Sequence, residues 1–262
     1  QTQFNLAASA QAVVEERILS YCRLAFKYSG GSRNLVYQGG VALNCVANSL
    51  IYEQDVFKNI WIMPNPGDAG SSLGAAALYH FEQTGNFVQW EGPYLGTNIK
   101  GSWPKEKFLD SLRKGEIFGV ANGRAEFGPR ALGNRSLLAD PRKDIKDKVN
   151  EVKKRDKFRP FAPAILEEYA GEYFEGPMNE YMQFVAKAKH DYSSVTHVDG
   201  TARVQIVKKD CKSIIRPILE EWYNRTKCPM LLNTSLNIKG EPIVNDIDDA
   251  ISFSKRSDIL VF

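Results

Sequence analysis

Apolar residues recur along the first ninety positions with two different spacings, which predict helices and strands in turn. Residues 7–29 carry them at the spacing of an amphipathic helix. Residues 34–38 and 60–63 are short apolar runs typical of buried strands. A glycine-containing turn follows each run, and helical patterns begin at about Ala42 and near Asp68. This order predicts an α/β arrangement.

Residues 86–104 combine glycine, proline and aromatic residues, which is typical of a linker, so we expect two domains, over residues 1–90 and 95–262. Beyond the linker, strands and helices mix without regular alternation, which favours an α+β domain. The expected helices cover residues 105–113, 213–226 and 246–254, and the expected strands cover 117–121, 161–166, 199–207, 230–233 and 259–262.

Composition narrows the class of protein. The 262 residues carry a net charge of only +3, so nucleic-acid binding is not expected, and no apolar run is long enough to cross a membrane. Four scattered cysteines predict reduced thiols and a cytoplasmic location. The chain begins at Gln1 and not at Met, from which we expect a fragment, a cleaved product or an incompletely covered chain.

The stretch from Gly123 to Pro163 places arginines on loops rich in glycine and proline. The first loop holds Arg124, Arg130 and Arg135, and the second holds Arg159. A charged helical run between the loops ends at Lys153, Lys154 and Arg155. Guanidinium groups on stiff loops bind phosphate or carboxylate in a bidentate manner. This stretch therefore predicts a site for an anionic, phosphate-bearing substrate.

Further polar residues stand at predicted strand ends, and each of them has an ordinary structural alternative. Arg203 alternates with apolar neighbours in a predicted strand, and Asn233 to Ser235 close another. They suit a phosphate or nucleotide site, or they are surface or ion-paired residues. The three histidines have no spacing that suggests a catalytic triad.

Each of two turns in the first ninety residues is compatible with a functional role and with a purely structural one. Gly39 and Gly40 join a strand to a helix, which suits an anion site or a tight packing turn. Asp68 either caps its helix or binds a metal or nucleotide. The small residues from Ala69 to Ala77 predict close packing of that helix.

Six segments, taken together, resemble successive motifs of the NodU/CmcH/TobZ O-carbamoyltransferases. They occur in the order of that family and extend over nearly the whole chain. They are GGVALNCVAN, NPGDAGSSLGAA, EFGPRALGNRSLLADPR, KKRDKFRPFAPAI, THVDGTARVQ and LLNTSLNIKGEPIV.

The resemblance implies the end of an actin-like (ASKHA) α/β transfer domain over residues 1–90, followed by a YrdC-like α+β domain over 95–262. The second domain would form carbamoyladenylate from carbamoyl phosphate and ATP, and the first would transfer the carbamoyl group to a substrate hydroxyl. The family pattern assigns catalysis to Lys153, Arg159 and Arg203. Arg130, Asn233 and Ser235 would complete the pocket for ATP and carbamoyl phosphate. In the first domain, Gly39, Gly40 and Asn44 match the nucleotide turn.

The resemblance also implies a divalent metal, iron or magnesium, with Asp68 as a ligand. The family's metal histidines lie in an N-terminal half that these residues do not include, so we expect the metal and acceptor sites to be incomplete here. A missing half, a partner chain or a homodimer would complete them. Two alternatives remain: a threonylcarbamoyl-type tRNA modification enzyme, and a nucleotide-binding module that is active only beside a partner chain.

Overall fold

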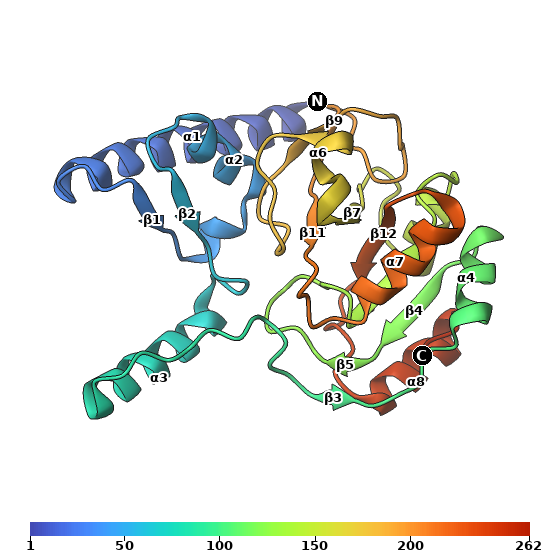
Figure 1. Ribbon diagram of the computed structural model, residues 1–262. Helices are drawn as coiled ribbons and strands as arrows, with labels where there is room; N and C mark the ends of the chain where they lie inside the picture. The colour runs from blue at the N-terminus through green and yellow to red at the C-terminus, as the bar shows by residue number, and fades with distance from the viewer. The chain divides into compact units, whose positions relative to one another are not determined.

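A computed structural model describes all residues from Gln1 to Phe262, and they form two compact units (Figure 1). The first unit comprises Gln1–Val88 together with Gln183–Val185, and the second comprises Gln89–Met182 and Ala186–Phe262. The sequence pattern predicts two continuous segments, and it does not show that residues 183–185 belong to the first unit. No helix in the structure is long and apolar enough to span a membrane.

The first unit contains three helices, one 3₁₀ turn and a two-stranded parallel sheet. In chain order they are α1 (Thr2–Tyr28), β1 (Asn34–Val36), η1 (Gly40–Leu43), α2 (Cys45–Glu53), β2 (Asn59–Trp61) and α3 (Asp68–Thr84). Helices α1 and α2 pack together through Ile18, Cys22, Ala47 and Ile51. The predicted order of elements in this unit is confirmed.

Residues 183–185 are held in the first unit by hydrogen bonds from buried side chains. The Asn48 side chain donates to the Gln183 carbonyl over 2.9 Å, and the Ser49 hydroxyl accepts from the Val185 amide at the same distance. The Gln183 amide donates to the Met63 carbonyl over 2.7 Å. Only the folded chain can show this pairing, because the partners lie more than a hundred residues apart.

The predicted close packing of the small residues after Asp68 is wrong for most of α3. Gly70 is the one buried residue of this helix. A Cβ at Gly70 would lie 1.8 Å from the Asn65 carbonyl oxygen, so the turn before the helix requires glycine here. The other small residues of α3 are partly or fully exposed within this unit.

The second unit is built on a five-stranded mixed sheet with strand order β11-β7-β12-β6-β4. These strands are β4 (Phe118–Ala121), β6 (Arg135–Ala139), β7 (Ala162–Leu166), β11 (Gln205–Val207) and β12 (Met230–Ser235). Its shorter strands are β3 (Asn98–Ile99), β5 (Gly123–Arg124), β8 (Phe174–Glu175), β9 (Ala186–Ala188) and β10 (Thr201–Ala202). Its helices are α4 (Lys105–Arg113), α5 (Lys146–Val152), η2 (Glu167–Tyr169), α6 (Ala170–Tyr173), α7 (Ile215–Thr226) and α8 (Ile247–Ser257).

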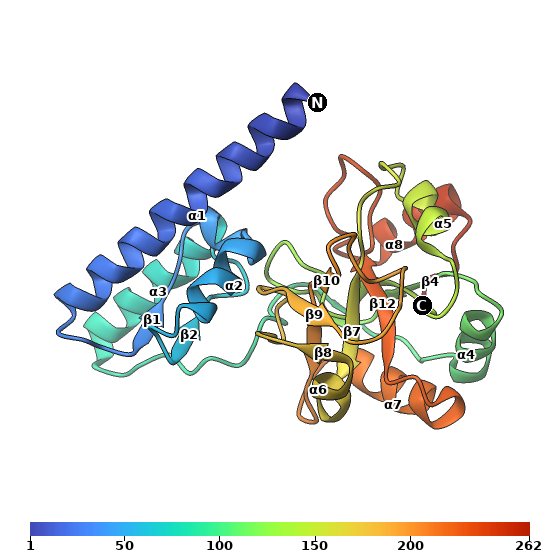
Figure 2. The ribbon, with the colours of Figure 1, turned by 90° about the horizontal axis from the view of Figure 1, so that it is seen from above.

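Helices cover both faces of this sheet. Figure 2 shows α5 and α8 on one side and α4, α6 and α7 on the other. Trp222 and Phe108 pack on the α4 and α7 side, and Phe253 and Val149 on the other. Apolar burial from two sides explains why the strands read as continuous apolar runs. The mixed α/β character expected from the sequence is confirmed.

Two sequence expectations for the strands of this unit are wrong. Residues 199–207 form two strands in different sheets. Ala202 belongs to β10, which pairs with β9, and Gln205 begins β11, which pairs with β7. Residues 259–262 make only an isolated bridge, from Val261 to Gly119. A further strand, β6, lies where the sequence indicated a loop.

Candidate functional site

The polar residues predicted from sequence gather at one end of the five-stranded sheet. The register pairs Asn233 of β12 with Ala162, at the start of β7, and Ser235 with Ser136, near the start of β6. Strand β11 also begins at this end, where Gln205 pairs with Ala164. The loops that carry Arg130, Arg159 and Arg203 each lead into a strand that begins here.

Arg159 and Arg203 lie close enough to Arg155 at this end for their charges to act on it. Burial lowers the pKa of Arg155 to about 10, and the positive charges of Arg159 and Arg203 add to the shift. The Arg155 guanidinium lies 4.3 Å from the centre of the Phe161 ring, and its Nε donates to Asn150 Oδ1 over 2.7 Å. The cluster is a concentrated positive charge, which favours an anionic ligand.

Lys153 is buried next to the end of β12. Its ammonium donates to Asn237 Oδ1 over 2.8 Å and to Ser235 Oγ over 3.1 Å, and it also contacts both backbone carbonyls. Burial lowers the pKa of Lys153 to about 7, and the nearby Arg155 contributes. Lys153 and Ser235 are therefore brought together, as the sequence suggested, but through direct hydrogen bonds that tie α5 to β12.

Asn233 connects three segments of this end of the sheet. Its Nδ2 donates to Gln205 Oε1 over 2.7 Å and to the Ala131 carbonyl over 3.1 Å. Its Oδ1 is buried and has no donor. Because Ala131 follows Arg130 directly, Asn233 fixes the base of the loop that carries this arginine.

Glu126 was not singled out from sequence, yet it organises this loop. One carboxylate oxygen accepts the amide N–H of Leu132 over 2.7 Å, of Asn134 over 2.8 Å and of Arg135 over 3.3 Å. Burial raises the pKa of Glu126, and the three amide donors partly offset this. The sequence signal was present, since a carboxylate at the head of a glycine-rich loop can collect backbone amides.

A cavity of about 380 Å³ opens between this loop and the turn after β12. Glu126, Gly128 and Pro129 line one side, and Asn237 and Glu241 line the other. Asn237 is also a partner of the Lys153 ammonium. The cavity is therefore bordered by a hydrogen-bond partner of Lys153.

The two other arginines of the loop segment that holds Arg130, Arg124 and Arg135, have structural roles. Arg135 is fully buried, and its guanidinium donates to backbone carbonyls that include Thr97 at 2.8 Å and Asn245 at 3.0 Å. Arg124 is exposed and donates to the Leu95 carbonyl. The expectation that Arg135 lies on an anion-binding loop is therefore wrong, because it begins strand β6.

The candidates in the first unit occupy turns and helix starts. Gly39 has a φ of 106°, which favours glycine, and Gly40 begins η1. Asn44 caps α2 by accepting the Ala47 amide over 3.1 Å. Asp68 is exposed at the first turn of α3. The nucleotide-turn and metal roles of these residues stay predictions.

The residues present do not make a metal site. No group of three or more histidine, cysteine, aspartate or glutamate side chains is arranged to hold an ion anywhere in the structure. Asp68 would supply one carboxylate, which is too few ligands for tight binding of iron.

Family models decide the identity of the chain. The carbamoyltransferase C-terminus model matches residues 109–262, and the carbamoyltransferase N-terminus model matches residues 1–77. The chain belongs to the carbamoyltransferase family.

Named relatives agree with this assignment. Nodulation protein NolO of Bradyrhizobium diazoefficiens is 37% identical over 99% of this chain and 53% of its own length. Nodulation protein NolNO of Sinorhizobium fredii is 35% identical over 99% of this chain and 43% of its own length. The chain thus spans about half the length of the curated carbamoyltransferase-family relatives it matches.

A crystal structure of full-length HypF, in a phosphate- and nucleotide-bound form, overlaps 62% of this chain and 20% of its own. The identity is 18% and the TM-score is 0.43. A likeness this weak bears on neither the fold nor the ligands of this member of the carbamoyltransferase family.

Proposed function

We propose that the second unit binds ATP and carbamoyl phosphate at the end of its sheet where Arg155, Arg159 and Arg203 lie, and that it forms carbamoyladenylate there. The observation that supports this most is the cluster of Arg155, Arg159 and Arg203, in which the positive charges of Arg159 and Arg203 help to lower the pKa of Arg155. A polyanion relieves that repulsion, and positive groups fixed in advance need little rearrangement when it binds. Two phosphate-bearing substrates require this kind of neutralisation.

The proposed reaction balances as follows. One carbamoyl phosphate, one ATP and one water give carbamoyladenylate, phosphate and pyrophosphate. Transfer of the carbamoyl group to a substrate hydroxyl then releases AMP. The chain would contribute to a carbamoyltransferase reaction whose acceptor half is completed by further protein segments, a partner chain or a second copy.

Individual residues suit separate parts of this task. Arg159 is exposed at the site and would contact phosphate directly. Asn233 offers a buried amide oxygen without a donor, which suits the amino group of a carbamoyl compound. Lys153, held by Ser235 and Asn237, would place a positive charge beneath the phosphates.

These residues do not supply the set of ligands that a metal in the proposed transfer step would need. Asp68 is the one candidate ligand named from the sequence, and it does not gather further ligands in this chain. The activation step proposed here therefore depends only on the second unit and on the magnesium that accompanies ATP in solution.

Calorimetric titration of the 262-residue chain with Mg-ATP and with carbamoyl phosphate tests the proposal. We expect both to bind, and Arg159→Ala to weaken ATP binding about 10- to 100-fold, because charge-assisted hydrogen bonds contribute about 1.5–3 kcal/mol each. Arg113→Ala is the matched control, since Arg113 is exposed at the end of α4 and away from the site. The proposal for this chain would be refuted if it bound neither Mg-ATP nor carbamoyl phosphate.

A further inference from the structure

The linker at the start of the second unit is hydrogen-bonded to the segment that leads into the Arg130 loop. The Gly96 amide donates to the Ala125 carbonyl over 3.0 Å, and the Ala125 amide donates to the Thr97 carbonyl over 2.9 Å. A Cβ at Gly96 would lie 2.9 Å from the Ala125 Cβ, so this close approach requires glycine. The two family models end at residue 77 and begin at residue 109, so neither of them includes this linker.

Two neighbouring linker residues hold opposite ends of the loop tip. The Pro93 carbonyl accepts the Phe127 amide over 2.6 Å. The Tyr94 hydroxyl donates to the Leu132 carbonyl over 3.3 Å. Four residues separate Phe127 from Leu132, and Arg130 is one of them. Because both bonds come from adjacent residues of one segment, they limit how far the two ends of the tip can move apart.

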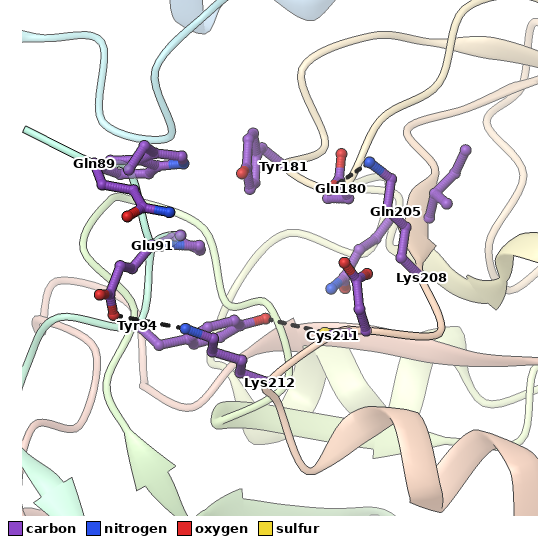
Figure 3. Close-up of a pocket in the computed structure, with 14 residues that line it drawn as sticks. Gln89, Glu91, Tyr94, Glu180, Tyr181, Gln205, Lys208, Cys211 and Lys212 are labelled. Carbon is purple, nitrogen blue, oxygen red and sulfur yellow. Dashed lines mark hydrogen bonds and ion pairs between the residues drawn. The ribbon is translucent and has the colours of Figure 1, made fainter.

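The Leu132 carbonyl also connects the linker to the strands of the sheet. It accepts Gln205 Nε2 over 2.9 Å, and Gln205 Oε1 accepts from Asn233 over 2.7 Å. Figure 3 shows Tyr94 and Gln205 at the wall of one cavity, of about 360 Å³. Through one carbonyl, Tyr94 is therefore connected to the strands β11 and β12, which carry Gln205 and Asn233.

The Tyr94 side chain is suited to a fixed contact. Its ring packs against the apolar cluster of Leu132, Ala162 and Met182. Burial raises the pKa of Tyr94, and the nearby Cys211 contributes, so the hydroxyl keeps its proton at neutral pH and remains a donor. Cys211 Sγ lies 3.7 Å from the hydroxyl oxygen, and a thiol there can donate to this oxygen without competing for Leu132.

We propose that Tyr94 is a positioning residue for the reaction of the second unit. Its hydroxyl and the adjacent Pro93 carbonyl hold the loop tip so that Arg130 stays where an anionic substrate meets it. The inference rests on the proposed function, since it requires substrates at this end of the sheet. It adds a linker residue, outside both family models, that acts through the loop and not by contact with substrate.

The test measures carbamoyl-phosphate-dependent release of pyrophosphate by the full chain and by Tyr94→Phe, Arg130→Ala and the two combined. Tyr94→Phe removes the bond to Leu132 and keeps the ring, so kcat/KM should fall about 2- to 10-fold, as expected for the loss of one neutral hydrogen bond. In chains that carry Arg130→Ala, the same substitution should change kcat/KM little, because the loop then has no arginine to position. Tyr94→Ala should cost more than Tyr94→Phe, since the ring is lost as well.

A matched control separates positioning from stability. Tyr192→Phe removes a tyrosine hydroxyl that is bonded to Tyr173 and leaves the contacts of the loop unchanged. It should keep the wild-type kcat/KM even if its thermal stability falls as much as that of Tyr94→Phe. Hydrogen exchange of the backbone amides of residues 127–134 gives a measurement that needs no activity, and it should be faster in Tyr94→Phe than in wild type or Tyr192→Phe.

The outcomes distinguish the positioning role from the proposed function. An active wild type whose kcat/KM is unchanged by Tyr94→Phe, or falls by the same factor when Arg130→Ala is present, would overturn the positioning role alone. Unchanged hydrogen exchange of residues 127–134 in Tyr94→Phe would also overturn it. Where Arg130→Ala is too slow to measure, titration calorimetry with carbamoyl phosphate gives the same comparison. A wild-type chain that releases no pyrophosphate would refute the proposed function, and the positioning role with it.

Discussion

Replacement of Glu126 by alanine tests how the loop that carries Arg130 is held in place. In the native chain one buried carboxylate oxygen accepts three backbone amides, from Leu132, Asn134 and Arg135. Alanine removes the acceptor and leaves these donors without a partner, and no other acceptor is shown for them. The substitution therefore acts on the segment between Arg130 and strand β6.

The magnitude follows from the geometry of the three bonds. Two are short, at 2.7 and 2.8 Å, and one is weak, at 3.3 Å. A hydrogen bond to a charged group contributes about 1.5–3 kcal/mol, so the two short bonds represent about 3–6 kcal/mol. Alanine also removes a carboxylate whose burial is costly, as the raised pKa of Glu126 indicates. We therefore expect the free energy of unfolding to fall by about 3 kcal/mol.

Urea denaturation followed by tryptophan fluorescence measures this loss. Trp222 is fully buried in the second unit and reports on its unfolding. Glu126→Gln should cost less, about 1 kcal/mol, because the amide oxygen can still accept the same donors. Glu91→Ala is the control, since Glu91 makes only an exposed ion pair and should change stability little.

If Glu126→Ala were as stable as the Glu91→Ala control, the Glu126 carboxylate would not be what holds this loop. The same conclusion would follow if Glu126→Gln were more damaging than Glu126→Ala, because acceptance of the three amides would then not be the role of this side chain. Loss of ATP affinity in a stable Glu126→Ala chain would link the loop to ligand binding.

Three further predictions follow from the same site. The affinity of the second unit for tripolyphosphate should fall as pH rises through about 7, because Lys153 loses its proton there. Titration calorimetry of wild type and Lys153→Met should show this pH dependence only in wild type. Because the unfolded state binds that proton up to about pH 10.5, the unliganded chain should gain stability between pH 7 and 10.5, which urea denaturation measures and which Lys153→Met should abolish. Gly133→Ala should cost about 2 kcal/mol or more in a thermal unfolding experiment, because φ is 122° and a Cβ would lie 2.5 Å from Ile215 and Ser213.

The candidate residues for anion binding could be named from the sequence because they stand beside local signals. Arg159, Arg203, Asn233 and Ser235 precede or close strands, and strand ends can be recognised from short apolar runs. The structure then brings these strand ends to one edge of the sheet. What the sequence could not show was which strands are neighbours, since β12 pairs with β6 and β7 across long stretches of chain.

Residues with long-range partners were misjudged or missed for the same reason. Arg135 resembles the other loop arginines in sequence, yet its guanidinium contacts Thr97 and Asn245, which lie far away along the chain. Gln205 and Tyr94 carry no local signal, and their connection through the Leu132 carbonyl appears only in the folded unit. Segment 199–207 reads as one strand because local spacing does not show the change of sheet.

We propose that this chain activates carbamoyl phosphate with ATP. Phosphorus NMR of the purified chain, mixed with both substrates and magnesium, tests it most directly. We expect pyrophosphate and phosphate to appear only when both substrates are present, with Arg113→Ala as active as wild type and Arg159→Ala nearly inactive. Formation of ADP in place of pyrophosphate, or pyrophosphate release that does not depend on carbamoyl phosphate, would contradict it.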